Sequence, residues 1–195
     1  RKKPPRKPPG FLFTPPPARA IVHPDVWYLT TTLLRNAQRK GIAMNSAIQI
    51  APARPQDAQA IADFQIAMAL ETENKTLDPA TVLAGVQRLM ANPQYGFYVV
   101  ARTATEPVAC LMITYEWTDW KDGLFWWIQS LYVQPAWRKH GIFKSMFTHI
   151  RDTAAASANC RGLRLYVETH NLPARKAYES LNMTPADYCM YEMKF

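Results

Sequence analysis

One segment constrains the fold most: residues 124–133 read Leu-Phe-Trp-Trp-Ile-Gln-Ser-Leu-Tyr-Val, with apolar side chains at positions that point to both faces of a strand. A strand with two apolar faces has to be covered on both sides, so it belongs in the centre of a sheet. Gln134 and Pro135 follow it, and Ile142, Met146 and Ile150 then recur at helical spacing. The chain therefore predicts a sheet with helices packed on its faces.

The rest of the chain alternates between the two patterns in the order β-α-α-β-β-β-α-β-α-β, which predicts a mixed α/β sheet with helices on both sides. Asp57 stands where it would cap the first helix, and Pro79 lies near the start of the second. The predicted strands are residues 48–51, 97–102, 108–117, 124–133, 163–167 and 188–193, and the predicted helices are residues 58–70, 79–90, 142–150 and 171–181.

Residues 1–43 have a different composition. They hold nine Lys/Arg, one acid and eight of the sixteen prolines, which favours extended polyproline geometry and cannot bury a core. The other 14 Lys/Arg and 14 Asp/Glu balance, so the net charge of +8 lies in this leader and we expect no nucleic-acid partner for the domain. Since Met44 is the first methionine, we predict a domain over residues 44–195 and a disordered or non-native leader. A natural basic tail for acidic partners is the alternative.

Several classes of protein are not expected. No uninterrupted apolar run reaches the ~20 residues of a membrane helix, and no apolar stretch near the start indicates secretion. The three cysteines are scattered and lack the spacing of metal ligands, which is typical of free thiols in a cytoplasmic protein, and we expect no metal site. They are Cys110, Cys160 and Cys189.

The connection after the central strand is the most informative for chemistry. The strand ends at Val133, and a proline, several basic residues and one glycine lead into a helix. The first N–H groups of a helix lack partners and carry partial positive charge, so this arrangement suits a pyrophosphate. An ordinary strand–helix connection with solvated charges is the alternative. The residues that add positive charge are Arg138, Lys139, His140 and Lys144.

Two motifs connect the chain to a known family. Residues 138–143, Arg-Lys-His-Gly-Ile-Phe, match the pattern [Q/R]-x-x-G-x-[G/A] except at Phe143, and residues 171–178, Asn-Leu-Pro-Ala-Arg-Lys-Ala-Tyr, match N-x-x-A-x-x-x-Y fully. Residues 48–57 are similar to the family's opening strand and helix. On these motifs, residues 46–195 resemble the GNAT superfamily of acyl-CoA N-acyltransferases, with a layout similar to diamine acetyltransferases.

The resemblance implies a mostly antiparallel sheet whose fourth and fifth strands splay apart around acetyl-CoA. The backbone of Leu131 and Val133 would pair with the pantetheine arm, an N–H near Leu131 would polarise the thioester carbonyl, and Tyr178 would protonate the departing thiolate. Asn171 would cap the last helix and touch the cofactor arm. The cofactor-binding residues implied are Leu131, Tyr132, Val133, Arg138, Lys139, His140, Gly141, Ile142, Phe143, Lys144 and Asn171.

Two residues depart from the family's pattern. Phe143 replaces a small residue, although its helical phase predicts that the ring points toward the core. Gln129 stands where diamine acetyltransferases carry a glutamate, and an amide cannot accept the proton of an ammonium group. Glu116 on the neighbouring strand is the replacement we predict as general base. Other candidates, each of which a solvated surface carboxylate would also explain, are Glu71, Glu73 and Glu168.

Tryptophans and carboxylates alternate around residues 116–127, and such a mixture suits a cationic amine through cation–π contact and charge pairing. One of the rings at Trp126 and Trp127 is expected to fill a sheet face instead. The aromatic and acidic residues concerned are Glu116, Trp117, Asp119, Trp120, Asp122, Trp126 and Trp127.

The leading hypothesis is therefore direct transfer of an acetyl group from acetyl-CoA to a primary amine of a small molecule, in a ternary complex. Acetylation of a protein N-terminus or lysine is one alternative, and a non-catalytic CoA-binding regulatory domain is another. Neither a membrane nor a nucleic acid is an expected partner, and a homodimer stays open.

Overall fold

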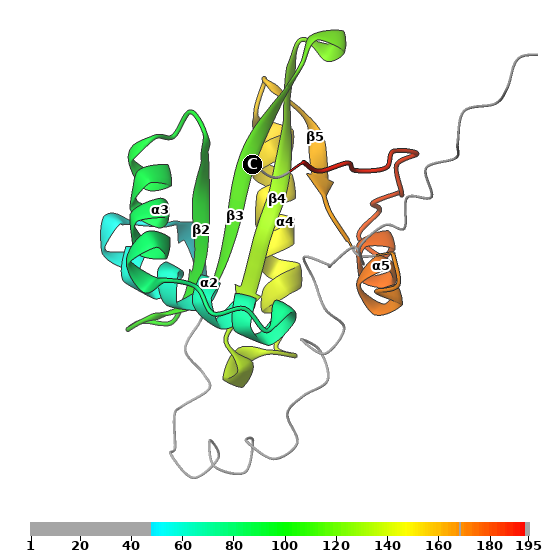
Figure 1. The fold of residues 1–195 in the computed structure, drawn as a ribbon. Helices are drawn as coiled ribbons and strands as arrows, with labels where there is room; N and C mark the ends of the chain where they lie inside the picture. The colour runs from blue at the N-terminus through cyan, green and yellow to red at the C-terminus, as the bar shows by residue number, and fades with distance from the viewer. Residues whose placement is uncertain (1–47, 168, 194–195) are drawn as a thin grey trace, which may run out of the picture.

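The computed structural model describes residues 48–167 and 169–193, so the predicted leader over residues 1–43 and Glu168 lie outside the described residues. Five strands form a sheet in the order β1-β2-β3-β4-β5 (Figure 1). The strands are β1 (Gln49–Pro52), β2 (Gly96–Arg102), β3 (Pro107–Thr118), β4 (Gly123–Val133) and β5 (Cys160–Leu165). The helices are α2 (Ala58–Glu73), α3 (Pro79–Ala91), α4 (Ile142–Ala156) and α5 (Leu172–Glu179), with short 3-10 turns η2 (Pro55–Asp57), η3 (Asp119–Lys121) and η4 (Pro135–Trp137).

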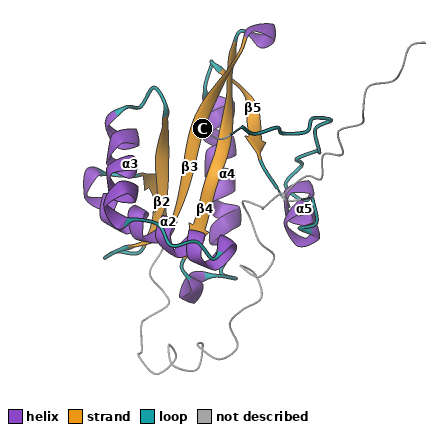
Figure 2. Cartoon of the chain, in the orientation of Figure 1, coloured by secondary structure: helices purple, strands orange, loops and turns teal. Residues whose placement is uncertain are grey.

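Helices cover both faces of the sheet (Figure 2). On one face, Met146 and Ile150 of α4 are fully buried in one cluster with Leu111 of β3. On the other face, Ile61 of α2 is fully buried in a second cluster with Val100 of β2. Adjacent strands are antiparallel except for β4 and β5, which are parallel. The predicted mixed, mostly antiparallel sheet with helices on both faces is confirmed.

A β-bulge interrupts β4 at Gln129. Met112 of β3 lies opposite Ser130, whereas the next residue, Ile113, lies opposite Ile128, so Gln129 has no residue opposite it. A bulge bends its strand and increases the local twist. The last residues of β4 therefore follow a different direction from the first.

The parallel pairing of β4 with β5 ends at the same point. Its last pair is Ile128 with Leu165, and β4 continues five residues further to Val133 without a strand on that side. In Figure 1, the chain that follows β5 runs away from β4 toward α5. The predicted splay of the fourth and fifth strands is thus confirmed.

The predicted last strand, residues 188–193, is wrong: this segment has no strand pairing in the structure. An apolar alternation forms a strand only where it lies against another backbone and buries one face. Here Tyr188 and Met190 line a pocket beside β5, and four large apolar side chains of the segment stand in solvent. Their exposed fractions run from 64% to 93%, at Tyr188, Met190, Tyr191 and Met193.

Asp57 occupies the N-cap position of α2, as predicted, but its side chain has a different role from the predicted one. Its carboxylate makes no capping hydrogen bond to α2 and instead accepts one from the N–H of Arg54, at 2.6 Å. It also pairs with Arg102 of β2 at 2.8 Å, and the Asp57 side chain is only 3% exposed. A buried carboxylate needs a cation, so this residue joins the first turn to the sheet.

Candidate active site

The end of β4 presents main-chain groups away from β3. The N–H of Gln134 bonds to Val108 O at 3.0 Å, and hydrogen-bonded pairs alternate along an antiparallel ladder. Leu131 and Val133 therefore direct their N–H and C=O groups to the opposite side, where no strand pairs with β4 beyond Ile128. Of these groups, the Val133 carbonyl accepts a hydrogen bond from Arg138 Nε at 2.8 Å.

The connection after β4 turns sharply into α4. Lys139 and Gly141 both have left-handed backbone conformations, with φ of 64° and 77°. Gly141 caps α4 without a side chain, and Ser145 N–H makes the first helical bond, to Gly141 O at 3.0 Å. The N–H groups of Ile142 and Lys144, in the first turn of α4, therefore have no carbonyl of a preceding helical turn to bond to. A Cβ added at Gly141 would meet nothing within 4 Å, so space is open beside these groups.

The side chains of the predicted loop residues go in different directions. Lys139, His140 and Lys144 are exposed, whereas Ile142 is buried in the core. Arg138 is only 11% exposed and pairs with Glu71 of α2 at 2.6 Å. The loop thus offers its main-chain amides and three exposed basic side chains to an anion.

The α5 helix begins with the predicted cap. Asn171 Oδ1 accepts a hydrogen bond from Ala174 N–H at 3.1 Å, and Asn171 is completely buried. Two turns later, the Tyr178 ring meets the ring of Phe143 edge to face, with centroids 6.1 Å apart. Burial raises the pKa of Tyr178 to about 12. Phe143 also contacts Phe147, at 6.3 Å, so its ring packs between α4 and α5.

A pocket of about 710 Å³ contains both predicted catalytic residues, Glu116 and Tyr178, in its lining. Glu116 accepts a hydrogen bond from Arg164 of β5 at 2.6 Å and another from the indole N–H of Trp127. Trp127 stacks on Tyr166, with ring centroids 4.3 Å apart. The wall thus combines carboxylate, guanidinium and aromatic faces between β4, β5 and α5.

The sequence profile of the acetyltransferase (GNAT) family matches residues 58–183, which is more than half of the chain. The chain belongs to this family. GNAT enzymes generally use acetyl-CoA as the acyl donor. No curated protein matches the chain at a significant level.

Solved structures support the same assignment. A possible acetyltransferase from Clostridium difficile 630 is 43% identical, with a TM-score of 0.72 over 76% of this chain and 97% of that one. Two others share the fold at low identity. A ribosomal-protein-alanine N-acetyltransferase from Brucella melitensis biovar Abortus 2308 is 19% identical (TM-score 0.60, covering 76% and 100%). An aminoglycoside N-acetyltransferase in complex with CoA is 11% identical (TM-score 0.63, covering 78% and 98%).

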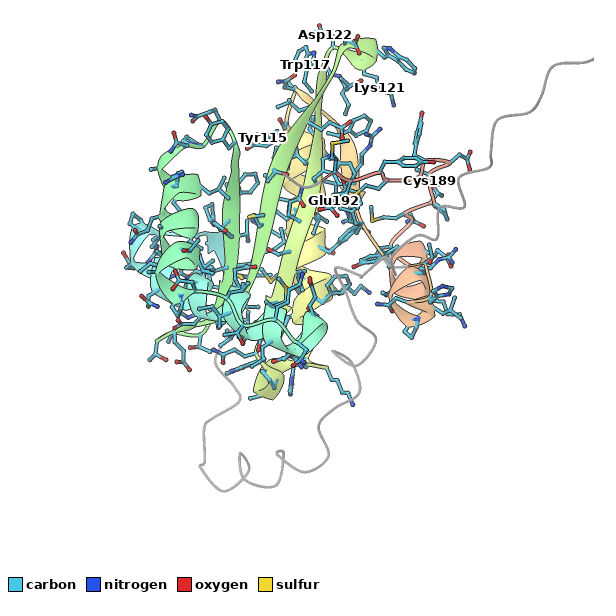
Figure 3. The ribbon with its side chains drawn as sticks, in the orientation of Figure 1. Tyr115, Trp117, Lys121, Asp122, Cys189 and Glu192 are labelled. Carbon is cyan, nitrogen blue, oxygen red and sulfur yellow. The ribbon has the colours of Figure 1, made fainter. Side chains whose placement is uncertain are left out.

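The tryptophans of this GNAT domain divide between three environments. Trp126 is 8% exposed and packs on Phe97 and Tyr115 in the core, as expected for one of the pair, whereas Trp127 faces the pocket. Trp117 and Trp120 are 59% and 90% exposed and do not line the pocket. Figure 3 places Trp117 at the tip of the β3–β4 hairpin, with Lys121 and Asp122.

Most residues that line the pocket were not among the predicted site residues, and Arg164, Tyr166 and Glu179 are examples. Arg164 and Tyr166 are two positions apart, so they share one face of the β5 backbone and its continuation. The polar alternation Arg-Leu-Tyr in this strand was the available signal. It could not show that Arg164 lies over the Phe125 ring, 3.7 Å from its centroid.

Within residues 48–167 and 169–193, no group of three or more His, Cys, Asp and Glu side chains is arranged to hold a metal ion. Nor does this described part contain a helix with the length and apolar character needed to cross a membrane.

Proposed function

We propose that this GNAT domain transfers the acetyl group of acetyl-CoA to a primary amine of a small molecule. The observation that carries the proposal is that three features lie around the point where β4 parts from β5, and that the Tyr178–Phe143 ring contact joins the pocket to the start of α4. The three features are the outward main-chain groups of Leu131 and Val133, the first amides of α4, and the pocket lined by Glu116 and Tyr178. The amine attacks the donor directly, without a covalent enzyme intermediate.

The donor is held by main-chain groups. The Leu131 carbonyl and the Val133 N–H pair with the pantetheine arm as a neighbouring strand would. The amides of residues 142–144 bind the pyrophosphate, where the helix dipole favours negative charge. Gly141 leaves room for its close approach. The exposed side chains of Lys139, His140 and Lys144 add positive charge, and Asn171 keeps the start of α5 beside the arm.

The chemistry divides among three groups. Glu116 accepts one proton from the ammonium group, since each of its bonded oxygens still has a second lone pair. The amine nitrogen then attacks the thioester carbon, while the Leu131 N–H stabilises the developing oxyanion. As the C–S bond breaks, Tyr178 donates its proton to the sulfur. The nitrogen's second proton and the proton on Glu116 leave to solvent, from which Tyr178 is reprotonated.

The pocket supports a small acceptor. A volume of about 710 Å³ is within the range of small-molecule sites, roughly 300–1,000 Å³. The stacked rings of Trp127 and Tyr166 offer π faces to a cation, and the carboxylates of Glu116 and Glu179 lie in the same wall.

The test is a CoA-release assay across a panel of small amines, amino acids and peptides, with the acetylated product identified by mass. We expect release that depends on a small primary amine. Release only with peptides would favour protein acetylation, and CoA binding without release for any amine would favour a regulatory domain. Either result would overturn the proposal.

A further inference from the structure

Three side chains from separate elements meet at the end of β4. Glu71 lies in the last turn of α2, Tyr132 on β4, and Arg138 in the connection to α4. The Tyr132 hydroxyl donates to Glu71 Oε1 at 2.8 Å, and Arg138 Nη2 donates to Glu71 Oε2 at 2.6 Å. Both carboxylate oxygens of Glu71 are therefore engaged.

Arg138 is bound within the protein and not extended toward solvent. Its Nε donates to the Val133 carbonyl at 2.8 Å, its guanidinium carbon lies 5.4 Å from the centre of the Tyr132 ring, and the side chain is 11% exposed. A guanidinium removed from water needs a carboxylate partner, and Glu71 supplies it. Tyr132 is fixed in turn by Phe64 of α2, with ring centroids 5.5 Å apart.

This arrangement selects which main-chain groups β4 can offer. Arg138 uses the outward carbonyl of Val133, so the outward N–H groups of Leu131 and Val133 and the Leu131 carbonyl are left for a ligand. It also ties the first residue of the predicted pyrophosphate loop to the strand before it. The position of the loop relative to β4 thus depends on a carboxylate from α2.

We infer that Glu71 is a positioning residue for the acyl-CoA site, acting through Arg138. The inference rests on the proposed function and deepens it. It assigns Arg138 a role in holding the loop, in place of contact with the pyrophosphate. It also removes Glu71 from the candidates for general base, because Glu71 does not line the pocket that contains Glu116 and Tyr178.

The experiment measures CoA affinity by calorimetry and steady-state kinetics for Glu71→Gln in the full chain. Losing a charge-assisted hydrogen bond that holds the loop should weaken CoA binding about tenfold. The KM for acetyl-CoA should rise by a similar factor, whereas kcat at saturating acetyl-CoA should stay within about twofold. Asp63→Asn, the same change on an exposed position of the same helix, should leave affinity unchanged.

Two further variants make the test sharper. Tyr132→Phe removes one hydrogen bond to Glu71 and should weaken CoA binding by less than Glu71→Gln. Arg138→Lys keeps the charge but loses the planar, several-donor geometry of the guanidinium. Its effect should not add to that of Glu71→Gln, because both substitutions break the same Arg138–Glu71 contact.

Three results would overturn the inference. The first is unchanged CoA affinity in Glu71→Gln. The second is a fall in kcat with unchanged affinity, which would mark Glu71 as a base. The third is a lower melting temperature with unchanged affinity, which would mark a purely structural contact. If the wild-type protein itself failed to bind CoA, the proposed function would be wrong. This outcome is distinguishable from failure of the inference, because it is measured on the wild-type protein and not on a variant.

Discussion

Tyr178 keeps its proton throughout the physiological range, because burial raises its pKa to about 12. A thiol has a reference pKa of about 8.5, so the phenol is the weaker acid of the two. Its hydroxyl therefore acts first as a hydrogen-bond donor to the sulfur while charge develops there. The edge-to-face contact with Phe143 holds the ring in place for that role.

Tyr178→Phe keeps the ring and removes the donor. We predict a fall in kcat of about 10²-fold, the lower end of the usual ~10²–10⁴ range for general acid catalysis. The KM for acetyl-CoA should change little, because the hydroxyl acts as charge develops on sulfur. Steady-state kinetics with a good amine acceptor is the measurement. Full turnover in a folded Phe variant would show that Tyr178 is only a packing residue.

At the scale of single helices and strands, the sequence correctly predicted the elements whose periodic apolar residues are buried in the structure. The helical spacing of Met146 and Ile150 corresponds to fully buried residues on α4, and residues 124–133 form a strand covered on both faces. The prediction failed for residues 188–193, where the alternation is not matched by a neighbouring strand. Periodicity reports which face is apolar, and it does not report whether a partner backbone lies beside it.

The site was predictable in part for the same reason. Asn171 and Tyr178 share one helix, so their relation follows from spacing. The pairing of Glu116 with Arg164 joins residues 48 positions apart and depends on the strand register. Gln129 stood out only as an amide in place of a carboxylate, whereas the structure shows that it forms the bulge where β4 leaves β5.

At the scale of the whole molecule, we propose that residues 44–195 are the folded unit. Both core clusters are built from residues 48–163, and the family match starts at residue 58. A protein that starts at residue 44 should keep its melting temperature and its CoA affinity within error. A large loss of stability in the shortened protein would show that the leader packs on the domain.

Stability should fall at high pH. Burial raises the pKa of Cys110 to about 12, and burial with the adjacent Cys110 raises that of Tyr98 to about 12. The folded state therefore holds protons that the unfolded state has lost above pH 9 for the thiol and 10 for the phenol. The stabilisation is complete below those values and is lost as pH rises to 12, by on the order of 1.4 kcal/mol per pH unit for each group.

Urea unfolding between pH 8 and 11 checks this expectation, with Tyr98→Phe as the matched variant. The free energy of unfolding should decline more gently with pH in the variant, because one of the buried titrating groups is absent. A stability that stays constant up to pH 11 would contradict the buried, protonated state of these side chains.

The acyl-CoA site proposed at the end of β4 is tested most directly by calorimetry, which compares CoA binding to Gly141→Asp and to Gly141→Asn. Both side chains have nearly the same shape, and both are strained similarly at the φ of 77°, so only the charge beside the first amides of α4 differs. If these amides bind the pyrophosphate, the Asp variant should bind CoA at least about tenfold more weakly than the Asn variant, at equal melting temperatures. Equal affinities in the two variants would contradict an acyl-CoA site at the end of β4.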